Sequence, residues 1–201
     1  MLFNTFEFLF IFLPITFLLF YYLVKYQHPK TALIWLTVSS FCYYGWWKPI
    51  YVLLIMGSIL FNYSLGSFLY YTHQKKIEKI KRRLLIFGIA SNLGVLGYFK
   101  YSNFLIENIT TALKLNFDLS EIALPLAISF FTFQQIAYLV DVSRGEIKES
   151  KFLHYCIFVV FFPQLIAGPI VYHKEMLPQF FRNPMCCPRV KNLTVGSTIL
   201  F

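Results

Sequence analysis

The chain has 201 residues, of which 58% are hydrophobic and 20% aromatic, while only 13% are charged. A soluble domain has about 25% charged residues and cannot bury this much apolar surface in one core. The composition excludes an ordinary water-soluble domain. In a membrane protein the net charge of +9 indicates basic cytoplasmic loops rather than a nucleic-acid partner.

Long apolar segments follow one another along the chain. The hydrocarbon core of a bilayer is about 30 Å thick and requires roughly 20 apolar residues per helix. We therefore predict an all-α, polytopic transmembrane protein with helices at residues 6–24, 31–47, 50–71, 84–99 and 122–140. The first segment lacks the basic start and the small-residue cleavage site of a signal peptide, so we expect it to be retained.

The most basic stretch lies at residues 75–83, where six cations accompany the single acid Glu78. Because Lys and Arg collect on the cytoplasmic side of a membrane, this stretch predicts a cytoplasmic loop. Helices that cross alternately from this loop place the N-terminus outside. They also place residues 100–121 in an external loop.

A sixth apolar segment, residues 152–172, contains Pro163, Gly168 and Pro169. Proline removes a backbone N–H and glycine permits unusual turns, so both break helices. Such a break at membrane depth is tolerated only inside protein or beside a watery cavity. We predict a broken, re-entrant hairpin that turns at residues 163–169 and keeps the later basic residues cytoplasmic. A kinked but continuous helix is the alternative.

Some polar and small residues inside the apolar segments indicate contacts between helices. Asn62 and Asn92 are interpreted as interhelical hydrogen-bonding groups. Ala90, Gly94 and Gly97 lie on one helix face, and this pattern favours close helix packing.

A second polar group occurs in the segment that contains Pro125, which we interpret as another broken helix. Polar side chains at membrane depth face the protein interior and mark either interhelical contacts or a cavity. For this group the two interpretations stay open, and its members are Gln134, Gln135, Tyr138 and Asp141.

The residues by themselves predict no reaction. No serine elbow, phosphate loop, zinc ligand set or carboxylate pair is found, and the four cysteines have no metal-ligand spacing. His28, His73 and His154 lie at predicted segment ends, where an interfacial role is expected. His173, just after the predicted hairpin, is the histidine worth testing for catalysis, although loop anchoring is the favoured interpretation.

Several motifs resemble the membrane-bound O-acyltransferases, in the branch that contains the alginate O-acetyltransferase membrane subunit. The matching stretches keep the same order along nearly the whole chain. They are MLFNTFEFLFIFLP at 1–14, YYGWW at 43–47, GYFKYSNF at 97–104, LPLAISFFTF at 124–133, DVSRG at 141–145 and PQLIAGPI at 163–170.

The resemblance implies an integral-membrane enzyme whose helices surround a central funnel. Such an enzyme moves an acyl group, here expected to be acetyl, from a cytosolic thioester such as acetyl-CoA to an extracytoplasmic polysaccharide hydroxyl. We expect no bound cofactor or metal, a location in the bacterial inner membrane, and a secreted or periplasmic acetyl-transfer protein as partner. The candidates for lining the funnel are Gln134, Gln135, Tyr138, Asp141, Gln164, Gly168, Pro169 and His173.

The family's catalytic histidine lies in a Trp-His-Gly signature that is absent here, so no catalytic residue is assigned and that histidine is expected beyond Phe201. The last residues resemble the start of the family's next helix. We therefore expect residues 1–201 to be the N-terminal portion of a single domain, inactive alone. Two alternatives are a non-catalytic remnant and part of a membrane transporter.

Overall fold

The computed structural model describes residues 5–26, 28–46, 48–113, 123–147, 151–167 and 176, and all regular structure in this part of the chain is helical. The prediction of an all-α protein is confirmed. The elements in order are a π-helical turn η1 (Phe8–Phe12), then α1 (Leu13–Lys25), α2 (Pro29–Gly45), α3 (Ile50–Gln74), α4 (Glu78–Leu113), α5 (Ile128–Ser143), α6 (Phe152–Val160) and α7 (Phe162–Ala167).

Prolines mark the starts of several helices. Pro14 and Pro29 lie in the first turns of α1 and α2, and Pro49 is the N-cap residue of α3. At Pro29 and Pro49 a proline sacrifices no hydrogen bond, because the first N–H groups of a helix have no partner within it, and its fixed φ suits the helix. Pro29 and Pro49 therefore separate α1, α2 and α3, whereas Pro14 lies inside the continuous helical stretch Phe8–Lys25, since η1 runs into α1 without leaving helical backbone angles.

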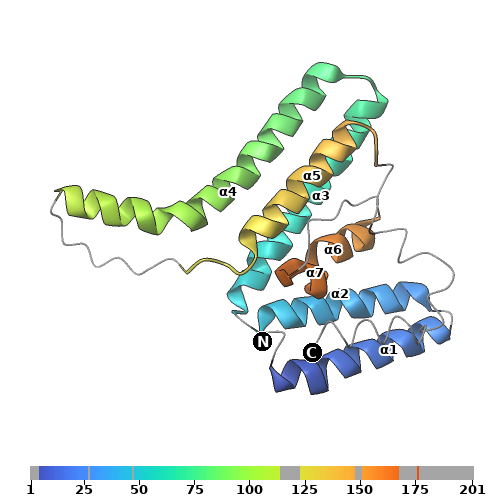
Figure 1. The fold of residues 1–201 in the computed structure, drawn as a ribbon. Helices are drawn as coiled ribbons and strands as arrows, with labels where there is room; N and C mark the ends of the chain where they lie inside the picture. Colours follow the sequence, from blue (N-terminus) through green and yellow to red (C-terminus); the bar gives the residue numbers. More distant parts are fainter. Residues whose placement is uncertain are drawn as a thin grey trace.

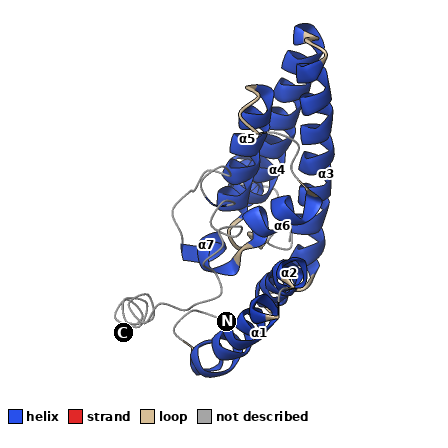
Figure 2. Cartoon of the chain, turned by 90° about the vertical axis from the view of Figure 1, so that its right-hand side faces the viewer, coloured by secondary structure: helices blue, strands red, loops and turns tan. Residues whose placement is uncertain are grey.

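The helices form two groups (Figures 1 and 2). Helices α3, α4 and α5 lie side by side, with α4 antiparallel to the other two, and each contacts both neighbours. The antiparallel pair α1 and α2 runs across the end of this group where α3 begins. The short helices α6 and α7 lie between the groups, and α6 contacts α2, α3 and α5.

Within the described residues, three helical stretches are long and apolar enough to cross a membrane: Phe8–Lys25, Ile50–Gln74 and Glu78–Phe104. Their outward side chains include large exposed apolar groups such as Phe68 and Phe87, which lipid can cover. These features are those of an integral membrane protein. Helices α2 and α5 have 17 and 16 residues, close to the lower limit for a crossing.

Three expectations about these helices are wrong. Helix α4 continues to Leu113, so residues 100–113 are helical where a loop was expected, while their external location stays a prediction. Pro125 lies in the turn before α5, not inside a broken helix, and α5 begins only at Ile128. In the described part of the chain, a Cβ atom added at Gly94 or Gly97 would meet no atom within 4 Å, so this face packs against no other helix.

Close helix packing occurs instead at Gly88 on α4. A Cβ atom there would lie 2.4 Å from Leu65 Cδ2 on α3 and 2.8 Å from Leu139 Cδ1 on α5. Real Cβ atoms do not approach so closely, so the absence of a side chain at Gly88 leaves the space that Leu65 and Leu139 occupy where the three helices meet.

Candidate functional site: two polar faces of one helix

The start of α5 is fixed by two tyrosines from other helices. The Tyr44 hydroxyl on α2 donates to the Leu126 carbonyl over 3.0 Å, and the Tyr51 hydroxyl on α3 donates to the Ala123 carbonyl over 2.5 Å. Ala127, the N-cap residue, has a left-handed backbone with φ of 58°. The two hydrogen bonds satisfy carbonyls in the irregular segment and set the position from which α5 enters the core.

One face of α5 presents Gln135, which is fully buried, to α3 and α4. Its Oε1 accepts hydrogen bonds from Ser58 Oγ and from Asn62 Nδ2, each over 2.6 Å. Asn62 and Asn92 also bond reciprocally: Asn92 Nδ2 donates to Asn62 Oδ1 over 2.6 Å, and Asn62 Nδ2 donates to Asn92 Oδ1 over 3.1 Å. The predicted interhelical role of the two asparagines is confirmed.

The Asn62–Asn92–Gln135 cluster links α3, α4 and α5. Ser58 and Asn62 lie one turn apart on α3, so they share a face and point at the same partner. Asn92 completes its bonding with the Gly88 carbonyl over 2.8 Å, at the level where the helices pack most closely. The cluster therefore holds the helices in one register.

A second face of α5 carries Gln134, Tyr138 and Asp141, which follow one another at intervals of four and three residues. They are 1%, 3% and 6% exposed. The Tyr138 ring centroid lies 4.4 Å from that of Tyr155 on α6, so this face points toward α6. The four residues predicted on this segment are thus all buried, but Gln135 lies on a different side of α5 from Gln134, Tyr138 and Asp141.

Gln134 differs from Gln135 in its hydrogen bonding. Neither its Oε1 nor its Nε2 has a hydrogen-bond partner in the described part of the chain. A buried amide without a partner costs about 1–3 kcal/mol by mutational measures, so native proteins provide water, ligand or protein for it. Gln134 is the predicted residue that most needs such a partner.

The sixth apolar segment is broken, as predicted. Helix α6 ends at Val160, and Phe161 adopts φ of −52° and ψ of 106° before α7 begins. Pro163 then occupies the first turn of α7, where its missing N–H is not needed. The Phe162 N–H donates to Ser40 Oγ on α2 over 3.3 Å, so protein satisfies the backbone at the break.

The break occurs two residues before the predicted turn, and its surroundings are aromatic. The Phe162 ring packs between Phe8, Phe12 and Tyr43, with centroid distances of 5.3–6.0 Å. Gln164 is buried on α7, which contacts α2 and α6. Gly168, Pro169 and His173, with the returning limb of the hairpin, lie outside the described residues.

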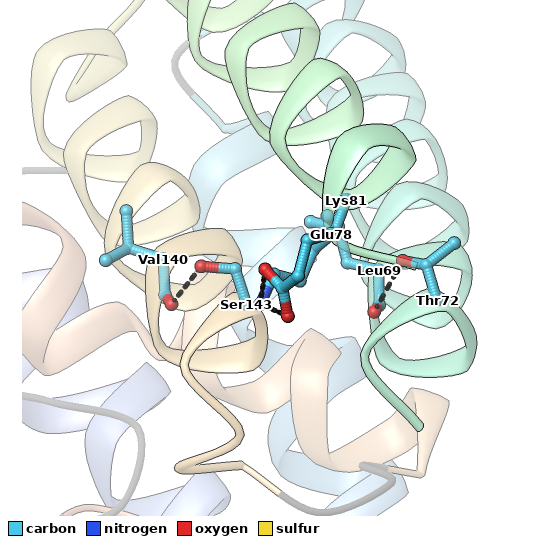
Figure 3. Close-up of polar contacts among 6 residues, drawn as sticks. All are labelled: Leu69, Thr72, Glu78, Lys81, Val140 and Ser143. Carbon is cyan, nitrogen blue, oxygen red and sulfur yellow. Dashed lines mark hydrogen bonds and ion pairs between the residues drawn. The ribbon is translucent and has the colours of Figure 1, made fainter. Parts of the chain in front are cut away.

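The opposite end of α5 meets the connection between α3 and α4 (Figure 3). Thr72 and Ser143 each bond to a backbone carbonyl of their own helix, at Leu69 and Val140, and Lys81 pairs with Glu78 over 2.8 Å. His73 lies against Gly145, where a Cβ atom would approach its Nε2 to 2.5 Å. The basic loop and the end of α5 therefore lie at the same end of the bundle.

The described groups can bind and orient but form no metal site. Among the described residues, no three His, Cys, Asp or Glu side chains lie close enough together to hold a metal ion. Sequence reasoning missed Ser40, Ser58 and Gly66, the last of which leaves space for the Tyr138 ring. Serines and glycines inside apolar helices have many packing roles, so residue type alone did not single these three out. The four-residue spacing of Ser58 and Asn62 is the one signal that could have found Ser58.

Comparison with known proteins gives the family. The chain is 41% identical over 98% of its length to a peptidoglycan O-acetyltransferase of Helicobacter pylori. It is 38% and 37% identical, over 90% of its length, to the probable alginate O-acetylases AlgI of Pseudomonas aeruginosa and Pseudomonas putida. The chain belongs to the membrane-bound O-acyltransferase family. It spans 42%, 34% and 37% of the length of these three relatives.

No family model and no solved structure matches the chain. Its described histidines lie at helix ends: His28 is the exposed N-cap residue of α2, His73 is in the last turn of α3, and His154 is in the first turn of α6. These positions agree with the interfacial placement expected from sequence.

Proposed function

We propose that the chain is part of an integral-membrane O-acetyltransferase that moves an acetyl group from a cytosolic thioester, such as acetyl-CoA, to a polysaccharide hydroxyl outside the cytoplasm. In this reaction the thioester C–S bond breaks and an ester C–O bond forms. The hydroxyl proton passes through a base to the released thiol. The similarity over 98% of the chain to a protein named for acetylating peptidoglycan carries the proposal.

Two acceptors deserve a direct test. The relative with 41% identity is named for peptidoglycan, whereas relatives with 30–38% identity are named for alginate. Both polymers offer sugar hydroxyls outside the cytoplasm, so the same donor chemistry serves either one. We propose peptidoglycan as the first acceptor to examine and an alginate-like exopolysaccharide as the second.

For the described residues we propose a role in binding and orientation. Gln134, Tyr138 and Asp141 form the buried polar face beside α6, and the unpartnered Gln134 amide is suited to hydrogen-bond a substrate carbonyl or water. Gln164, Gly168, Pro169 and His173 are proposed to line the same funnel. The catalytic histidine is proposed to lie outside these 201 residues.

Location and partners follow from the same proposal. We propose that the enzyme lies in the bacterial cytoplasmic membrane with its N-terminus outside, so that the basic residues 75–83 face the cytosolic donor. A secreted or periplasmic acetyl-transfer protein is proposed to carry the acetyl group from the membrane to the polymer.

The test is to delete the gene and measure ester-linked acetate in purified peptidoglycan and in exopolysaccharide. We expect acetate to fall in one polymer and to return on complementation with the full-length gene. The variant Gln134→Leu should restore less than a tenth of this acetate at equal membrane abundance, while Gly94→Leu, on an uncovered surface, should restore all of it. Unchanged acetate in both polymers after deletion would disprove the proposed activity.

A further inference from the structure

The outer face of α3 carries an aromatic stripe that ends in a cation. Phe61 and Phe68 are 39% and 64% exposed, and Lys75, the exposed C-cap residue, follows seven residues later. Seven residues are nearly two helical turns, so the three side chains share one face. On α4 the same arrangement runs in the opposite direction, from the exposed Arg83 to Phe87 one turn later.

The two stripes are continuous with each other. The Phe61 and Phe87 rings pack edge to face with centroids 6.1 Å apart, which joins α3 to α4 on this outer surface. A path of exposed apolar surface therefore leads from the cations at the shared end of α3 and α4 toward the middle of both helices.

The path ends at a groove between α3, α4 and α5 with a volume of about 380 Å³. Phe61 lies at the junction, because it belongs to the stripe and also lines the groove. At Gly57 a Cβ atom would meet nothing within 4 Å, so the groove is open above this residue. The walls are uncharged and mostly apolar, and the floor contains the amides of Asn62 and Asn92.

The cationic end has the features of a lipid headgroup contact. Six cations and one acid lie within residues 75–83, and that acid, Glu78, is already paired with Lys81. The Lys75 ammonium lies 4.5 Å from the ring centroid of Tyr71, which is 54% exposed, so the cation stays at the edge of the apolar surface. Basic clusters beside a membrane span attract anionic lipids by about 1 kcal/mol per cation.

We propose that this face binds an anionic phospholipid. Its phosphate contacts Lys75 and Arg83, and one acyl chain follows Phe68, Phe87 and Phe61 into the groove above Gly57. Charge complementarity favours a lipid over another apolar helix, because the path to the groove begins at the exposed cations Lys75 and Arg83, which form no ion pair in the described part of the chain. The proposal does not depend on acetyl transfer.

The headgroup contact is tested by native mass spectrometry of the full chain, released in mild detergent from vesicles of equal phosphatidylglycerol and phosphatidylcholine. We expect phosphatidylglycerol adducts to dominate. The double variant Lys75→Gln/Arg83→Gln should reduce that preference roughly 25-fold, because each cation contributes about fivefold. The control Lys48→Gln/Lys100→Gln removes the same charge away from this end, beside Tyr51 and Tyr101, and should keep the preference.

The groove is tested separately with Gly57→Leu, which fills the open space above the helix. We expect retained lipid to fall at least about fivefold, the effect of losing roughly 1 kcal/mol of apolar contact. The matched control Gly94→Leu adds the same side chain on α4 at another uncovered glycine and should change nothing.

Three results would overturn the proposal. Equal adducts of the two lipids would remove the headgroup contact, and equal effects of Gly57→Leu and Gly94→Leu would remove the groove. Binding of a second copy of the chain in the groove, in place of lipid, would assign this face to helix packing.

Discussion

The ring of Tyr138 on α5 lies directly against the backbone of Gly66 on α3. A Cβ atom at Gly66 would be 2.6 Å from Cε1 and 2.9 Å from the hydroxyl oxygen of that ring. Because Tyr138 also packs on Tyr155 of α6, it cannot move away freely. The absence of a side chain at Gly66 therefore sets the position of the polar face that contains Gln134 and Asp141.

The substitution Gly66→Ala should destabilise the protein by about 1–3 kcal/mol, the usual cost of adding atoms to a packed core. This cost exceeds the gain of up to about 1 kcal/mol that alanine normally brings to a helix interior. The free energy of unfolding in detergent micelles or bicelles measures the change. Gly57→Ala is the control, because its added methyl meets open space and should be neutral or stabilising.

The sequence predicted a large part of this fold because its strongest signals are chemical extremes. Uncharged apolar runs marked α1, α2 and α3, and prolines marked the break after α6. The end of α4 was missed because residues 100–113 are only moderately apolar, so neither hydropathy nor a helix breaker marks a boundary there.

The candidate site was predictable only as a set of residue types. Gln134 and Gln135 are adjacent and equally polar, and their division between two faces depends on the rotation of α5 about its axis. That rotation is set by contacts such as Tyr138 on Gly66 and Leu139 on Gly88, which join distant parts of the chain. Local sequence patterns do not contain this information.

The Asn62–Asn92 pair should show strong non-additivity. Asn92→Leu leaves the Asn62 amide with an unmatched oxygen, at a cost of about 1–2 kcal/mol. In Asn62→Leu/Asn92→Leu both groups are removed, and Gln135 keeps its bond from Ser58. We therefore expect the double variant to be no less stable than the worse single variant. A double-mutant cycle on unfolding free energies measures the coupling, and strictly additive losses would contradict the reciprocal bond.

The break between α6 and α7 should depend on Ser40. This side chain accepts the Phe162 N–H and donates to the Leu36 carbonyl over 2.7 Å. Ser40→Ala leaves a buried N–H without its acceptor, so we expect a loss of about 1–3 kcal/mol in unfolding free energy. Ser64→Ala provides the control, because that exposed hydroxyl bonds only to Leu60 of its own helix in the described structure. Equal stability of the two variants would mean that Ser40 does not support the break.

Two helix ends with the same geometry carry different residues. Gly145 after α5 and Lys76 after α3 both have positive φ, 77° and 56°, and both lie in Schellman turns. Gly145→Ala should destabilise by more than about 1 kcal/mol, because strain is added to a contact with His73. Lys76→Gly should stabilise by up to about 1 kcal/mol, because the strained residue is exposed. Thermal unfolding of both variants distinguishes these opposite signs.

The proposed orientation can be tested at the two ends of α3. This helix has 25 residues and a length of roughly 37 Å, enough to cross the hydrocarbon core. In a cysteine-free parent we introduce Lys48→Cys before the helix and Lys75→Cys after it, and expose spheroplasts to a membrane-impermeant maleimide. We expect Lys48→Cys to react in intact spheroplasts and Lys75→Cys only after lysis, because the basic loop is predicted to be cytoplasmic. The reverse pattern would invert the topology. Reaction of both sites from outside would mean that α3 does not cross the membrane, although its apolar side chains and its length favour a crossing.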